Sequence, residues 1–127
     1  HRDLHSFPTR RSSDLDEKNF DALYSIGALY YNKAASMTAE LNKLADDYSK
    51  AGIEKYKAKQ KEVLGQFDLA LPYFQRCEKS NPNDQNTLIA LKEIYAKKDE
   101  LDLSNEFKAR LEKVNAGEKN ASSYFKN

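Results

Sequence analysis

The sequence predicts an all-α protein made of antiparallel helix–turn–helix units, the first of which is longer than the next. Outside the first fifteen residues, proline occurs only at Pro72 and Pro82 and glycine at four positions, which favours long helices. Apolar residues recur every three or four positions through most of the chain, as on one face of a helix. From Gly65 to Tyr95 they fall at the spacing of a helical repeat.

Residues 1–15 do not follow this pattern. Their sequence, HRDLHSFPTRRSSDL, has no apolar periodicity and resembles a one-frame translation of a sequencing adapter. We interpret them as an artefactual or disordered tail and expect the natural N-terminus to be missing. The segment holds both histidines, three of the 21 basic residues and two of the 20 acidic ones, so 18 of each sign remain and the net charge becomes zero. Its Arg10–Arg11 pair is therefore not a nucleic-acid signal.

The first helix is expected at about residues 19–49. Asn19 is a candidate N-cap. Gly52 is expected to end the helix in the left-handed conformation. The expected buried stripe consists of Leu23, Ile26, Tyr30, Ala34, Met37, Leu41, Leu44 and Tyr48.

The second helix is expected at about residues 52–80, antiparallel to the first after a short glycine-containing turn. Pro72 lies inside it and predicts a mild kink, because proline removes one backbone hydrogen bond. The polar cluster 81–84 should end this helix and cap the next. The expected buried stripe consists of Ile53, Tyr56, Gln60, Val63, Phe67, Ala70, Phe74 and Cys77.

Two shorter helices should follow, at about residues 84–98 and 102–115, joined by a turn at 97–99. The former presents Leu88, Leu91, Ile94 and Tyr95, and the latter presents Leu103, Phe107, Leu111 and Val114. Residues 116–127 have weak periodicity, and we expect a frayed tail there, with docking of Tyr124 and Phe125 as the alternative.

The spacing of these residues resembles the tetratricopeptide repeat, an α-solenoid unit of 34 residues. Its opening half is matched by Leu23, Ile26, Gly27 and Tyr30. Its closing half and the next unit are matched by Gly65, Phe67, Ala70, Phe74, Cys77, Pro82, Leu88, Leu91 and Tyr95. The resemblance implies that Gly27 and Ala70 sit where the helices cross, and that an apolar patch including Phe20, Leu23 or Tyr24 lies open for a neighbouring repeat.

One departure from the repeat is large, since Tyr30 and Gly65 are 35 positions apart in place of 4, an insertion of 31. The insertion either folds as its own helix pair, with breaks near Ser36 and Gly65, or lengthens both helices of the first hairpin. The continuous stripes favour an extended, coiled-coil-like hairpin that projects roughly 23 Å beyond an ordinary repeat.

The resemblance also implies a concave groove that binds a peptide or protein partner. The residues that match its lining are Tyr24, Ala28, Tyr31, Asn32, Ile89, Glu93 and Lys97. Alternatively, Tyr24 and Tyr31 pack against a preceding repeat.

Other chemistry is not indicated. Lys55, Lys57, Lys59 and Lys61 alternate around the helix and are interleaved with acidic residues, which favours a solvated face over nucleic-acid binding. Asp46–Asp47 lacks further metal ligands, and Cys77 lacks a histidine to activate it. No cofactor motif and no apolar run of membrane-spanning length are present.

We therefore expect a soluble, non-enzymatic interaction scaffold. The alternative is a structural role, in which the long hairpin, around Met37 and Leu41, is a surface for assembly or homo-oligomerisation. A third reading is the non-catalytic part of an enzyme whose active site precedes this sequence.

Overall fold

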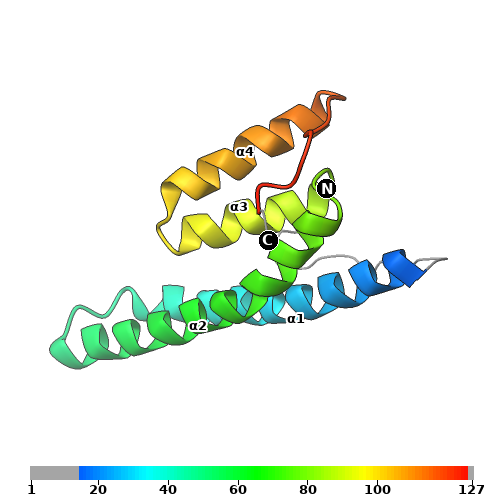
Figure 1. The fold of residues 1–127 in the computed structure, drawn as a ribbon. Helices are drawn as coiled ribbons and strands as arrows, with labels where there is room; N and C mark the ends of the chain where they lie inside the picture. The colour runs from blue at the N-terminus through cyan, green and yellow to red at the C-terminus, as the bar shows by residue number, and fades with distance from the viewer. Residues whose placement is uncertain (1–14, 126–127) are drawn as a thin grey trace.

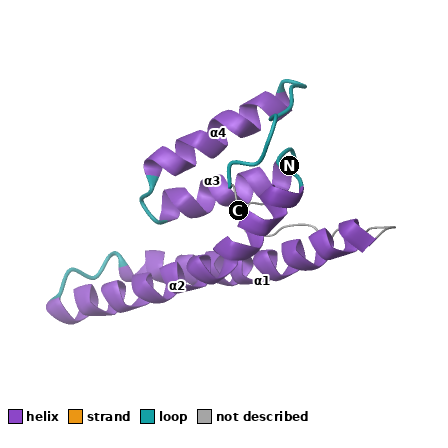
Figure 2. Ribbon diagram, viewed as in Figure 1, coloured by secondary structure: helices purple, strands orange, loops and turns teal. Residues whose placement is uncertain are grey.

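The computed structural model describes residues 15–125, and in that range it contains four helices and no strand (Figures 1 and 2). The all-α prediction is thereby confirmed. The interpretation of residues 1–14 lies outside the described part of the chain. The helices are α1 (Leu15–Leu44), α2 (Lys50–Ser80), α3 (Gln85–Lys97) and α4 (Leu101–Asn115).

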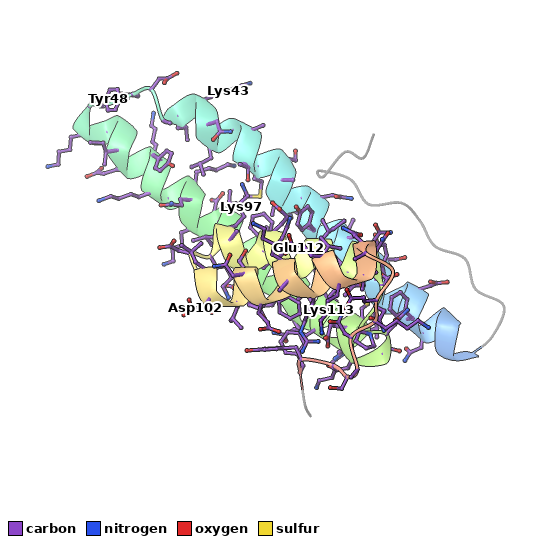
Figure 3. All side chains as sticks on the ribbon, turned by 90° about the horizontal axis from the view of Figure 1, so that it is seen from above. Lys43, Tyr48, Lys97, Asp102, Glu112 and Lys113 are labelled. Carbon is purple, nitrogen blue, oxygen red and sulfur yellow. The ribbon has the colours of Figure 1, made fainter. Side chains whose placement is uncertain are left out.

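The first hairpin is extended, as predicted. α1 has 30 residues and α2 has 31, and each runs without a break, whereas α3 and α4 have 13 and 15. Ser36 lies inside α1, and Gly65 lies inside α2 and not at a turn. Figure 3 shows Tyr48 at the outer end of this hairpin, well away from α3 and α4.

The turn between α1 and α2 differs from the expectation. α1 ends at Leu44, five residues early, and Gly52 lies inside α2. The reason is that Ser49 caps α2: its hydroxyl accepts from Gly52 N at 3.1 Å, while Asp47 Oδ1 accepts from Ser49 N at 3.0 Å. A Cβ at Gly52 would lie 2.2 Å from Asp47 Cγ, so a larger residue there would displace the carboxylate that accepts from Ser49 N.

The start of α1 and its buried face also differ from the expectation. Asn19 is an exposed residue within α1 and does not cap it. Ile26 and Leu29 are exposed and Tyr30 is only half-buried, so the buried stripe is rotated by about one residue. It consists of Phe20, Tyr24, Gly27, Ala28, Tyr31, Ala34, Ala35 and Leu41.

Gly27 and Phe74 determine this rotation. A Cβ on Gly27 would lie 3.0 Å from the ring of Phe74, so the two helices approach closely there. Phe74 is fully buried and meets Tyr24 and Tyr31 edge-on, with ring centroids 5.9 and 6.5 Å apart. Edge-to-face pairs of this kind contribute about 0.5–1.5 kcal/mol each beyond the area they bury.

α2 joins the two hairpins. It packs along α1 and, with its second half, against α3, which pairs with α4. Figure 1 shows that α2 bends upward in its second half, the half that contains Pro72, where a kink was expected. The stripe of Val63, Phe67, Ala70, Phe74 and Cys77 is buried, whereas Ile53 and Gln60 near the outer end are exposed.

The C-terminal segment is docked, so the frayed-tail expectation is wrong for residues 120–125 and the alternative, docking of Tyr124 and Phe125, describes them. Asn120 is buried; its backbone N–H donates to Asn83 Oδ1 at 2.7 Å and its side-chain amide donates to Pro82 O at 3.2 Å. The rings of Tyr124 and Phe125 pack on Phe107 of α4 at 5.3 and 5.5 Å. Weak periodicity did not reveal this docking, because the segment is held by individual side chains.

The helix crossing gives a stability prediction. Gly27→Leu should lower the free energy of unfolding by about 1–3 kcal/mol, because the new side chain overlaps the immobile ring of Phe74. Gly65→Ala is the matched control: no atom lies within 4 Å of its Cβ position, so we expect a gain of about 0.5–1 kcal/mol in stability. Urea denaturation followed by circular dichroism measures both. A Gly27→Leu chain as stable as the wild type would contradict the close crossing.

Candidate functional site

The extended hairpin has two flanks with different surroundings. On one flank, Tyr30 of α1 stacks on Tyr73 of α2, with ring centroids 6.1 Å apart. On the other flank, Asp68 and Gln75 of α2 contact the second hairpin: Lys98 Nζ lies 2.6 Å from Asp68 Oδ1, and Gln75 donates to the Tyr95 hydroxyl at 3.0 Å. Only the second flank therefore faces α3, and we call it the inner flank.

A shallow depression of about 310 Å³ runs along α1. Helical spacing places it on the inner flank, since Asn32 and Tyr30 leave α1 in opposite directions. It is lined by Asn32, Ala35, Ser36, Thr38, Ala39 and Asn42. Because these side chains are short, another chain could approach α1 closely here. The amides and hydroxyls among them can form hydrogen bonds with the backbone of such a chain.

Three of the residues expected to line the groove are buried inside the hairpin. Tyr24 is 0% exposed, Tyr31 is 4% exposed and Ala28 is also buried. They face α2 because the crossing at Gly27 turns this stripe inward. Neither the groove nor the preceding-repeat alternative describes the two tyrosines, since their rings pack on Phe74 of the same hairpin.

The other four expected lining residues remain at the surface. Asn32 is partly buried on the inner flank of α1. Ile89 and Glu93 are partly buried and Lys97 is exposed, and their four-residue spacing places them on one line along α3. The surface therefore keeps the amide and the charged groups of the expected groove and loses its aromatic residues.

Asn32 has an unusual environment within this surface. Its side-chain Oδ1 is buried and accepts no hydrogen bond from any described residue. Leaving a buried amide oxygen without a donor costs about 1–3 kcal/mol. A backbone N–H entering the depression beside Asn32 would supply that donor.

Two apolar patches lie elsewhere on the hairpin. The patch expected on the first helix is made of different residues, because Phe20 and Tyr24 are buried while Ile26 and Leu29 are exposed, the latter to 68%. The second patch is at the outer end, where Tyr48 is 83% exposed and Ile53 42%. A hollow of about 360 Å³ there is lined by Leu44, Ala45, Asp47, Tyr48, Ile53, Tyr56, Lys57 and Gln60.

Charged groups of the second hairpin act on residues of the first. Burial raises the pKa of the Tyr31 hydroxyl well above its usual range, and the negative charge of Glu93 on α3 raises it further. The hydrogen bond to Asp68 raises the pKa of the Lys98 ammonium. On the outer half of the hairpin, Lys59 Nζ lies 2.6 Å from Glu40 Oε2, so one of the four alternating lysines is paired with an acid on α1.

Sequence reasoning missed most of the depression. Ala35, Ser36, Ala39 and Asn42 recur with Asn32 at helical spacing, and this run of small residues was the available signal. It also missed Glu78, which is fully buried and contacts the C-terminal segment. No local pattern marks that role, since the contacting residues are 46 positions apart.

The described residues carry no metal-binding cluster of three or more His, Cys, Asp or Glu side chains. Cys77 is buried, and its thiol donates to the carbonyl oxygen of Phe20 at 3.8 Å. Among the helices in residues 15–125, none combines the length and the apolar character needed to cross a bilayer.

Comparisons with protein-family models, with curated proteins and with solved structures find no match to this chain. The resemblance to tetratricopeptide repeats stays a prediction from the residue pattern.

The buried tyrosine gives a pH prediction. A raised pKa in the folded state means that Tyr31 keeps its proton where the unfolded chain loses it. The contribution of Tyr31 to the free energy of unfolding is therefore fully present below the pKa of tyrosine in the unfolded chain, about 10, and is lost as the pH rises above that value. As the pH rises from about 9 to 11, the free energy of unfolding should fall by about 1 kcal/mol less in Tyr31→Phe than in the wild type. Tyr48→Phe is the matched exposed control in urea titrations, and identical slopes for all three chains would contradict the assignment.

Proposed function

We propose that the chain is a non-enzymatic protein-interaction scaffold that holds an extended segment of a partner along its inner flank. The depression on α1 and the Ile89–Glu93–Lys97 line on α3 form the proposed binding surface. Within it, the buried Asn32 oxygen without a donor is the observation that carries the proposal.

The chemistry of this surface suits a peptide backbone. Asn32, Ser36 and Asn42 offer amide and hydroxyl groups beside alanines, so a chain can approach closely and exchange backbone hydrogen bonds. Glu93 and Lys97 give the surface charges of both signs, which can set the direction of the bound segment. This proposal agrees with the function that the repeat resemblance implies.

The proposal does not include catalysis. The thiol of Cys77 is enclosed in the core. The affinity of a scaffold comes from surface area and a few well-placed polar contacts.

A peptide-display selection on the immobilised full chain tests the proposal. Selected peptides should bind Asn32→Leu and Lys97→Glu variants about tenfold more weakly, because each change removes one polar contact. Asn105→Leu and Lys108→Glu, exposed on α4, are the matched controls and should bind as the wild type does. Recovery of no specific peptide, or equal binding by all four variants, would contradict the groove.

A second candidate function is assembly through the outer end of the hairpin. It rests on the exposed Tyr48 and Ile53, whose apolar surface borders a hollow far from the second hairpin. Solitary exposed apolar residues are ordinary, but an aromatic ring beside a hollow is a feature of interfaces. Met37 and Leu41 are not the residues to test, because they are wholly or partly buried within the hairpin, and a charge there would open it.

Sedimentation velocity at increasing protein concentration tests the assembly candidate. If the chain associates through the hairpin end, Tyr48→Ser combined with Ile53→Ser should weaken the association about tenfold or more, because both apolar side chains leave the interface. Leu101→Ser, also exposed but on α4, is the matched control. A wild-type chain that is monomeric throughout, or association that the double variant leaves intact, would exclude this candidate.

A further inference from the structure

The C-terminal segment lies on the surface of the helices in the way that a peptide ligand would. In Figure 1 it runs back from the end of α4 toward the junction of α2 and α3. It forms no helix between residues 118 and 125. Asn120 contacts the turn between α2 and α3, and residues 122–125 contact side chains of α2 and α4. We call the surface made by Glu78, Phe107 and Arg110 the tail groove.

Glu78 binds the backbone of this segment. Its carboxylate is fully buried; Oε2 accepts the Tyr124 N–H at 2.8 Å, and Oε1 accepts the Ser123 hydroxyl. Arg110 Nη1 lies 3.7 Å from the same carboxylate and donates to the Ser122 carbonyl at 3.0 Å. A carboxylate and a guanidinium thus contact donors and an acceptor that any extended segment with a hydroxyl residue would present.

Phe107 supplies the apolar part of the groove. Its ring is fully buried between Tyr95 at 5.7 Å and the two aromatic residues of the segment. The guanidinium of Arg110 also lies over the Tyr124 ring, 5.4 Å from its centroid. The tail groove therefore binds two adjacent aromatic side chains, which follow the hydroxyl residue in the sequence.

The segment is held unevenly along its length. Asn120 is buried and hydrogen-bonded to Asn83, Pro82 and Arg110, whereas residues 116–119 are exposed and Gly117 has a φ of 85°. Beyond Asn120, Ala121 and Ser122 are exposed and Tyr124 is 38% exposed. Residues 121–125 can leave the groove without unfolding a helix.

We propose that the tail groove is a binding site for an extended partner segment in which a hydroxyl residue precedes two aromatic residues. The chain's own Ser123–Phe125 fills the groove when no partner is bound. A buried carboxylate and a buried ring need an occupant, since an unpaired charge in the interior is costly. A partner segment of the same chemistry conserves every contact, so one occupant can replace the other.

This site is separate from the inner flank. Glu78, Phe107 and Arg110 belong to α2 and α4, whereas the binding surface proposed on the inner flank is made by the depression on α1 and by the Ile89–Glu93–Lys97 line on α3. The two proposals can therefore fail independently, because variants of one surface leave the other unchanged.

Peptide binding to the full-length chain tests the proposal. The probe is a fluorescein-labelled peptide with the sequence of residues 119–125. It should bind the Tyr124→Ala/Phe125→Ala chain about tenfold or more tightly than the wild type, because that tail no longer competes. Adding Glu78→Gln to the double variant should weaken the peptide again by about tenfold, while Glu112→Gln, exposed on α4, is the matched control.

A second measurement avoids dependence on the folding of the variants. The same peptide with a photoreactive benzoylphenylalanine in place of Phe125 should cross-link to α4 of the wild-type chain near Phe107 when present in excess. A peptide with alanine at both aromatic positions should not compete.

Three results would overturn the proposal. One is equal peptide affinity for the wild type and the Tyr124→Ala/Phe125→Ala chain together with no cross-link near Phe107. Another is affinity that Glu78→Gln leaves unchanged. The third is a wild-type dimer that depends on Tyr124 and Phe125, which would assign the groove to the tail of a second copy.

Discussion

The contact of Gly27 with Phe74 determines the rest of the structure. Without a side chain at Gly27, α1 and α2 approach until the phenylalanine ring fills the gap between them. Tyr24 and Tyr31, about one turn away on either side, then close over the same ring. Once this face of α1 is turned inward, Asn32 and Tyr30 must lie on opposite flanks. The position of every surface considered for binding on the hairpin follows from that one crossing.

The sequence predicted the elements with strong local signals. The cluster around Pro82 and Asp84 stops α2 and caps α3, where the Asp84 carboxylate accepts from Thr87 N at 3.0 Å. The face of α1 could not be predicted in the same way, because Leu23, Ile26 and Tyr30 form an apolar stripe beside the one that is buried. Periodicity identifies a helix, but it does not choose between two neighbouring stripes when both are apolar. Only the partner side chain, Phe74, makes that choice.

The candidate sites also differ in whether a local sequence pattern could predict them. Asn32, Ile89, Glu93 and Lys97 could be placed at the surface from the repeat pattern, because their spacing within each helix is local. The tail groove could not be predicted, because Glu78 and Ser123 are 45 positions apart and neither belongs to a periodic series. Because the Glu78 carboxylate is buried, it requires partners, and the docked segment supplies them.

The length of the first hairpin gives the molecule a mechanical property. α2 is continuous through its bend, and the part from Lys50 to Pro72 is roughly 33 Å long. A rotation of about 5° at the bend would therefore move the outer end by about 3 Å, as a lever converts a small angle into a larger displacement. The short arm of this lever is the half of α2 that carries Glu78 and contacts α3. The outer end of the hairpin, where Tyr48 lies, is thus connected by one continuous helix to the part of the protein that contacts its own C-terminal segment.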